Sequence, residues 1–240
     1  MAGTMGTTLM RMLVTRPEPD ALSTLARLEA LGIEAVAAPV MIRQTLNTSL
    51  PPPDGFTAMV LTSANAVRTL VERGVVERYR HLPVFAVGDR TANDASEAGF
   101  TKVSSAAGAF QDLVNAMTIA RVPGPIFYPA GKHQSADLAK ALAPLGVMVA
   151  TAKIYEMVPI ETLPESVLAA LADGSIRAVL VYSRRTAEIF AALAKTLKSR
   201  VSHRWSQEIK GPCSEKTEIA FRIQPRVIGK TWAAEGVTMP

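Results

Sequence analysis

Short apolar runs alternate along the chain with stretches whose leucines recur at helical spacing. Residues 12–14 form the first apolar run, leucines then recur at every third position from Leu22 to Leu31, and Gly32 separates them from the strand-like segment 33–40. A short apolar run predicts a buried strand, a one-sided leucine stripe predicts a helix, and glycine commonly ends a helix. We therefore predict a strand, a helix and a second strand, with the leucine stripe in the core.

The same order returns in the second half of the chain. Residues 126–130 are apolar, the leucines of residues 138–145 lie on one predicted helix face, and Gly146 precedes a strand-like segment from Val147 to Tyr155. Similar order at similar spacing is the mark of an internal repeat. We interpret the chain as two related halves.

Two further pairs of segments support this interpretation. In the first pair, each of the apolar runs 58–61 and 178–181 is followed by one residue, then a serine and a helix-like stretch. In the second pair, residues 83–92 match residues 211–217. Serine is a good residue for the start of a helix. Strands that alternate with helices predict parallel sheets, and each half then supplies three corners where a strand is followed by a helix start.

These corners are the expected place for a ligand. Ligands of open parallel sheets bind outside the carboxyl ends of the strands. Helix N-termini there present unpaired N–H groups and the positive end of the helix dipole, which suits carboxylates or phosphates. We expect a soluble α/β protein whose working site lies in a cleft between two lobes.

Length and composition agree with a two-lobed protein of a reducing compartment. The chain has 240 residues, of which 48% are hydrophobic and 20% charged, and its single cysteine, Cys213, excludes a disulfide within the chain. No apolar run approaches the roughly 20 residues of a membrane span, and residues 1–10 do not resemble a signal peptide. We expect a cytoplasmic protein.

The net charge of +5 is concentrated in residues 195–240, which carry nine Lys/Arg and four Asp/Glu. A solvated basic surface, attraction of a multiply anionic small molecule and nucleic-acid binding all remain open. Aromatic residues make up only 5%, and no run interleaves them with arginine, which weighs against nucleic acid.

Several common sites are missing from the sequence. It contains no G-x-G-x-x-G and no G-x-S-x-G, and residues 124–133 differ from a P-loop in spacing and in having His133 where Ser or Thr would bind magnesium. The histidines are isolated from one another, and Cys213 has no partner at metal-ligand spacing. We therefore expect a site without a metal or a nucleotide.

Taken in order, the corners resemble the uroporphyrinogen-III synthase family. The matching segments are Thr15-Arg16-Pro17, Thr62-Ser63-Ala64-Asn65-Ala66-Val67, Val87-Gly88-Asp89-Arg90-Thr91-Ala92, Tyr155-Glu156-Met157-Val158-Pro159, Tyr182-Ser183-Arg184-Arg185-Thr186-Ala187 and Ser214-Glu215-Lys216-Thr217. The resemblance implies two Rossmann-like lobes with parallel sheets flanked by helices. Residues 10–38 and 157–240 would form one lobe and residues 42–153 the other, joined by two extended linkers that can act as hinges.

The resemblance also implies a reaction. The substrate would be hydroxymethylbilane, an open tetrapyrrole with eight carboxylates, which loses water and closes with inversion of its terminal ring to give uroporphyrinogen III. No cofactor or metal is implied, nor any nucleic-acid or membrane partner, and a monomer is expected. Positioning would decide the product, because closure without inversion gives the other isomer.

Individual residues take their roles from this resemblance. Tyr155 is expected to help the hydroxyl group leave; the alternative is a tyrosine that packs at a strand end. The expected substrate-binding residues are Arg16, Ser63, Asn65, Gly88, Thr91, Gly131, Lys132, Ser183, Arg185, Ser214 and Thr217. For these the alternatives are helix caps, first-turn residues, surface ion pairs and solvated charges.

The end of the chain departs from the family, and other functions stay open. After Thr217 we expect a helix, a strand and a last helix, but the sequence leaves no room for the last helix, and residues 198–210 are unusually basic and polar. One alternative is a two-lobed binding protein for a polyanionic small molecule, without catalysis. A second is a module that binds nucleic acid through the basic end, with a steep salt dependence.

Overall fold

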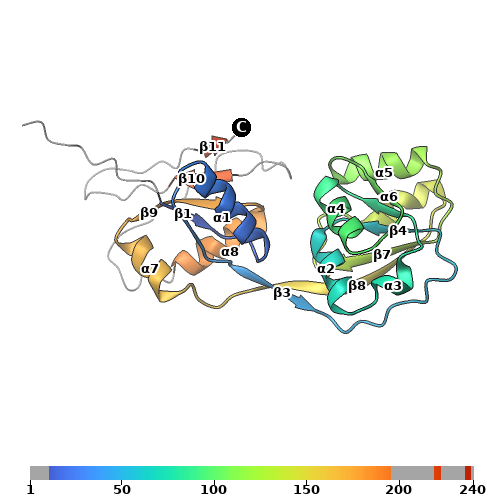
Figure 1. The fold of residues 1–240 in the computed structure, drawn as a ribbon, viewed down its shortest axis with the longest axis horizontal. Coiled ribbons are helices and arrows are strands. Elements are labelled where there is room, and N and C mark those ends of the chain that lie inside the picture. The colour runs from blue at the N-terminus through green and yellow to red at the C-terminus, as the bar shows by residue number, and fades with distance from the viewer. Residues whose placement is uncertain (1–10, 196–218, 223–235, 239–240) are drawn as a thin grey trace, which may run out of the picture. The chain divides into compact units, whose positions relative to one another are not determined.

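The computed structural model describes residues 11–195, 219–222 and 236–238. It divides into two compact units, one of residues 1–42 and 158–240 and the other of residues 43–157 (Figure 1). The chain crosses between the units twice, in strand β3 (Met41–Thr45) and in strand β8 (Val149–Pro159). Among the described residues, no helix combines the length and the apolar composition that a membrane span requires.

Unit 1 is built on a five-stranded sheet in the order β11-β10-β9-β1-β2. Strand β1 pairs in parallel with β2 and β9, whereas β10 pairs antiparallel with both β9 and β11. The strands are Arg11–Val14, Ala35–Ala37, Ile176–Val181, Ile219–Arg222 and Gly236–Thr238, numbered β1, β2, β9, β10 and β11. The described helices are α1 (Asp20–Ala30), α7 (Glu165–Ala172) and α8 (Arg184–Lys195).

Unit 2 carries a six-stranded sheet in the order β3-β8-β7-β4-β5-β6, and its β8-β7-β4-β5-β6 part is parallel. Its other strands are β4 (Ala58–Leu61), β5 (Val84–Ala86), β6 (Val103–Ser105) and β7 (Ile126–Gly131). Its helices are α2 (Ala64–Glu72), α3 (Val76–Tyr79), α4 (Asp89–Glu97), α5 (Phe110–Ile119) and α6 (Leu138–Leu142), the last followed by a 3-10 turn, Ala143–Leu145.

The central strand of unit 2 shows why its sequence is apolar throughout. Met59 and Leu61 belong to one buried cluster, and Val60 between them belongs to another. Successive side chains of a strand point to opposite faces, and helices cover both faces of this sheet, so no position of β4 can be polar. This arrangement confirms the predicted α/β class with parallel sheets flanked by helices.

The leucine stripes are only partly in the core, which corrects the sequence prediction. In α1, Leu28 is 2% exposed, but Leu22 and Leu31 are 61% and 67% exposed. A step of three residues falls about 60° short of a full helical turn, so the stripe winds off the buried face. The buried face is instead Ala21, Thr24 and Leu28. In the second stripe Leu138 and Leu142 are buried, whereas Leu145 in the 3-10 turn is 46% exposed.

Two other local predictions differ from the structure. The segment predicted as one strand from Ile33 to Val40 contains the short strand Ala35–Ala37, and the next strand, Met41–Thr45, joins the other sheet. After Thr217 we expected a helix, but strand β10 begins at Ile219 and runs antiparallel to β9.

Candidate active site

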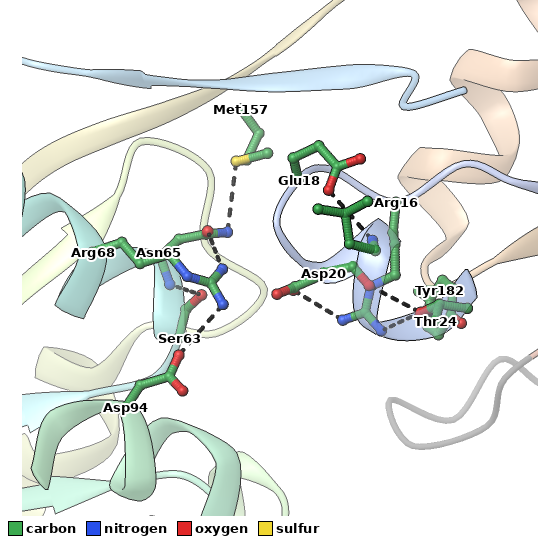
Figure 2. Close-up of polar contacts among 11 residues, drawn as sticks. Arg16, Glu18, Asp20, Thr24, Ser63, Asn65, Arg68, Asp94, Met157 and Tyr182 are labelled. Carbon is green, nitrogen blue, oxygen red and sulfur yellow. Dashed lines mark hydrogen bonds and ion pairs between the residues drawn. The ribbon is translucent and has the colours of Figure 1, made fainter. Parts of the chain in front are cut away.

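The corner after β4 carries two of the predicted site residues. Ser63 has extended backbone and its Oγ accepts the N–H of Asn65 at 3.2 Å, so it caps α2 as expected. The Asn65 side chain accepts from Arg68 Nη1 at 3.1 Å and donates to Met157 Sδ at 3.7 Å (Figure 2). Arg68 in turn lies 3.4 Å from Asp94. Asn65 is thus held between two neighbours at the start of the helix.

Tyr155, the predicted catalytic residue, lies in β8 and is 8% exposed. Burial raises the pKa of its phenol, and a side-chain hydrogen bond with Ser63 and the charge of Arg43 oppose that rise. Because the net pKa is raised, the group is a neutral phenol across the physiological range. It can therefore donate a hydrogen bond or a proton.

Arg43, which is not among the predicted site residues, contributes a positive charge near this phenol. It lies in β3, and its Nη1 is 3.0 Å from the hydroxyls of Thr45 and Thr69 and 2.8 Å from a carboxylate oxygen of Glu72. The hydrogen bond from Arg43 is the main cause of the lowered pKa of Glu72. Nothing local in the sequence connects residue 43 with position 155, because only the sheet order brings β3 beside β8.

A second buried phenol, Tyr128, lies on the neighbouring strand β7. Its hydroxyl is 2.9 Å from that of Thr62, and burial raises its pKa. Tyr128 and Tyr155 belong to different core clusters, yet each bonds to one residue of the Thr62-Ser63 pair. Tyr128 is not among the predicted site residues, because it lies inside a segment whose pattern predicts only a buried strand.

Gly131 and Lys132 follow at the end of β7. Gly131 pairs with Tyr155 in the sheet, and the N–H of Lys132 donates to the Tyr155 carbonyl at 2.8 Å. The Lys132 ammonium lies 2.9 Å from Glu156, which His133 also approaches at 3.3 Å. The hydrogen bond from Lys132 is the largest cause of the lowered pKa of Glu156, and the hydrogen bond from His133 lowers it further. Lys132 is thus ion-paired rather than merely solvated.

The corner after β5 contains Gly88 and Thr91. Gly88 is the N-cap residue of α4, and Thr91 is buried in the first turn of that helix. Asp89 accepts the hydroxyl of Ser105 at 2.6 Å, which ties this corner to the end of β6. The β6–α5 corner was missed because no serine, threonine or asparagine precedes α5 at its N-cap, where Ala109 stands.

In unit 1, Arg16 follows β1 and is held by its own surroundings. Its Nη2 lies 2.9 Å from Asp20, its Nη1 donates to Thr24 at 3.4 Å, and its guanidinium stacks 4.2 Å from the centre of the Tyr182 ring (Figure 2). The Tyr182 hydroxyl also donates to Thr24 at 3.3 Å. Arg16 precedes α1, which begins at Asp20, so this ion pair spans the loop between β1 and the helix rather than a helical turn.

The corner after β9 contains Ser183 and Arg185. Ser183 Oγ accepts the N–H of Thr186 at 3.1 Å and lies 2.8 Å from its hydroxyl. Ser183 therefore satisfies a first-turn donor of α8, as its counterpart Ser63 does in α2. Arg185 is half-buried in the first turn of the same helix.

The remaining predicted residues cannot be placed. Ser214 and Thr217 lie outside the described residues, as do the segment 198–210 and Cys213. Among the residues that the structure describes, no three His, Cys, Asp or Glu side chains gather as a metal would require.

The fold and these corners define a class of protein: two α/β units, each with helix starts at the carboxyl ends of parallel strands, suited to a small anionic ligand. The family model described as uroporphyrinogen-III synthase HemD matches residues 23–225. The chain therefore belongs to the uroporphyrinogen-III synthase family, as the sequence predicted. The family implies a lyase-type enzyme that closes the ring of a tetrapyrrole substrate.

Solved structures of the family share the fold. Uroporphyrinogen-III synthetase from Helicobacter pylori is 18% identical with a TM-score of 0.54, and the match covers 77% of this chain and 78% of that chain. A mutant uroporphyrinogen III synthase from Thermus thermophilus is 20% identical with a TM-score of 0.50, over 79% of this chain and 80% of that one. At these identities the likeness supports the two-unit fold alone.

Proposed function

We propose that this chain is a hydro-lyase that converts hydroxymethylbilane to uroporphyrinogen III, with Tyr155 as the group that helps the hydroxyl leave. Family membership supplies the reaction. The observation that carries the assignment is the buried phenol of Tyr155 beside Ser63, at the carboxyl ends of the unit 2 strands. The partner is a hydroxyl, which can donate to the phenol oxygen, whereas the core phenol of Tyr79 donates its own proton to the Pro51 carbonyl.

The surroundings of Tyr155 suit proton donation. If the Ser63 hydroxyl donates to the phenol oxygen, the phenol proton remains available for the substrate. The bond from Ser63 and the charge of Arg43 both favour the phenolate that forms during transfer. Proton transfer to the hydroxyl breaks the carbon–oxygen bond, and water leaves. The substituted α-carbon of the terminal ring then attacks the electrophilic methylene carbon to form a spiro intermediate. The bond from this carbon to its original methylene bridge breaks, the bridge bonds to the free α-carbon of the same ring, and the proton lost from that carbon can restore the phenol.

The carboxylates of the substrate would bind at the helix starts. Helices α2, α4 and α8 each begin at the carboxyl end of a parallel strand, where N–H groups not taken by the cap remain open to an anion. The proposed contacts are Arg16, Ser63, Asn65, Gly88, Thr91, Gly131, Lys132, Ser183, Arg185, Ser214 and Thr217. For Arg16 and Lys132 an incoming carboxylate would compete with Asp20 and Glu156.

Other parts of the proposal concern the protein as a whole. We propose domains of residues 10–38 with 157–240 and of residues 42–153. We further propose a cytoplasmic monomer that needs neither a cofactor nor nucleic acid.

The test is a product assay. The chain is supplied with hydroxymethylbilane, the products are oxidised, and isomers I and III are separated by chromatography. Isomer III in excess of the reaction without protein is expected. Isomer I alone, at the rate without protein, refutes the catalytic proposal, and tetrapyrrole binding without turnover would then favour the binding-protein alternative. Duplex DNA bound with a steep salt dependence would favour the nucleic-acid alternative.

A further inference from the structure

Gly131 lies opposite Tyr155 where strands β7 and β8 change register. Ala130 pairs with Lys153, but Gly131 pairs with Tyr155, so β8 has an extra residue at this point. The N–H of Lys132 donates to the Tyr155 carbonyl at 2.8 Å, which fixes the backbone of Tyr155 immediately after the irregularity. A bulge of this kind re-aims the side chain beside it.

The Tyr155 ring occupies the space that a side chain at position 131 would need. A Cβ atom built on Gly131 would lie 2.8 Å from Tyr155 Cζ and 3.0 Å from both Cε2 and the hydroxyl oxygen. Gly131 does not have the left-handed backbone that makes glycine necessary elsewhere in the chain, for example at Gly124 and Gly146. The close approach of the phenol therefore leaves room only for glycine at position 131 unless the phenol moves.

Any larger residue at position 131 would move the hydroxyl rather than the strand. Both backbones are held by the β7–β8 pairing, whereas the atoms that clash are the far end of one side chain. The ring can only turn away from β7, and its hydroxyl then leaves the place beside Ser63. Resting on the proposed function, we propose that Gly131 is a positioning residue: it sets the Tyr155 hydroxyl at the point where it serves the leaving group.

The test compares Gly131→Ala with Tyr155→Ala and with the double variant. Because a misplacement of about 1 Å can cost about 100-fold in rate, we expect Gly131→Ala to lower kcat by about 10- to 100-fold with KM changed less than about threefold. In chains labelled with ¹³C at tyrosine Cζ, the signal of Tyr155, assigned by its loss in Tyr155→Phe, should shift in Gly131→Ala. The Tyr128 signal should stay.

The double variant separates the clash from any other effect of the methyl group. Once the ring is gone, Gly131→Ala should leave the urea midpoint of the Tyr155→Ala chain unchanged. If Gly131→Ala fails to fold, restored folding in the double variant supports the clash, and equal failure of both overturns it. An unchanged Tyr155 signal or unchanged kcat in Gly131→Ala also overturns the proposal. If the unaltered chain makes no isomer III, the proposed function fails, and the tyrosine signal still decides the positioning.

Discussion

Ser63 has two partners in the structure, and a double-mutant cycle can separate them. Its Oγ accepts the N–H of Asn65 at 3.2 Å as the cap of α2, and its side chain bonds to Tyr155. Ser63→Ala removes both interactions, whereas Tyr155→Phe removes only the second and leaves the ring in place. The free energies of unfolding of these variants therefore report each interaction.

The two interactions of Ser63 set the expected losses in the free energy of unfolding. Loss of a serine cap costs about 1 kcal/mol. Loss of the bond to Tyr155 costs about another 1 kcal/mol, and more if the buried phenol finds no new partner. We expect Ser63→Ala to cost about 2 kcal/mol in the unaltered chain and about 1 kcal/mol in the Tyr155→Phe chain. Tyr155→Phe alone should lower the free energy of unfolding by about 1 kcal/mol, because it removes the bond to Ser63 but leaves the Ser63 cap of α2 intact.

The assay is urea unfolding followed by circular dichroism for the four chains. A coupling of about 1 kcal/mol exceeds the roughly 0.3–0.5 kcal/mol within which independent sites add. Protection of the α2 amides in hydrogen exchange should fall in both Ser63→Ala chains, because the cap is lost in each. If Ser63→Ala costs the same in both backgrounds, Ser63 and Tyr155 do not bond, and the proton-donor geometry is refuted.

Glu156, the buried tyrosines and Leu142 each carry one further prediction. Glu156→Gln should lower KM for hydroxymethylbilane about two- to fivefold, because Lys132 and His133 lose their carboxylate partner and can then meet a carboxylate of the substrate. The control is Glu77→Gln, which breaks only the ion pair with Arg80. An unchanged KM in Glu156→Gln would contradict a role for Lys132 in substrate binding. The phenols of Tyr79, Tyr128 and Tyr155 have raised pKa values, so their contribution to stability is complete below the ordinary value of about 10 and is lost as the pH rises through the folded values. Absorbance at 295 nm should show these three ionising above pH 10, with loss of circular dichroism; ionisation of all tyrosines near pH 10 in an intact fold would contradict this. Leu142→Ala should lower the free energy of unfolding in urea by about 2–5 kcal/mol, and Leu145→Ala by less than about 0.5 kcal/mol. The reason is that the Leu142 side chain is 1% exposed and that of Leu145 is 46% exposed. Similar costs for the two variants would contradict the assigned core.

The parts of the fold that were predictable from sequence depend on local chemistry. Apolar runs such as residues 58–61 became strands, and Ser63 and Ser183 became helix caps, because neighbours along the chain decide both outcomes. The leucine stripe misled because its three-residue spacing was read as a straight face, although a helix turns every 3.6 residues. The antiparallel β10 was missed because strand direction depends on the connection, which a strand's own residues do not encode.

The candidate site was predictable only in part for a related reason. Each corner could be located from its own segment, but the partners come from distant positions: Thr62 meets Tyr128, Lys132 meets Glu156, and Arg43 meets Thr69. The sheet order creates these contacts, so no spacing in the sequence announces them. The clearance at Gly131 also depends on the register shift between β7 and β8, which only the folded sheet shows.

Turnover of hydroxymethylbilane by Tyr155→Phe tests whether Tyr155 is the proton donor, with Tyr79→Phe as the matched control in the core of the same unit. We expect Tyr155→Phe to lower kcat about 100- to 10,000-fold while the fold and KM are largely retained, and Tyr79→Phe to keep the kcat of the unaltered chain. Formation of isomer III by Tyr155→Phe at the unaltered rate would contradict the assignment of Tyr155 as the proton donor.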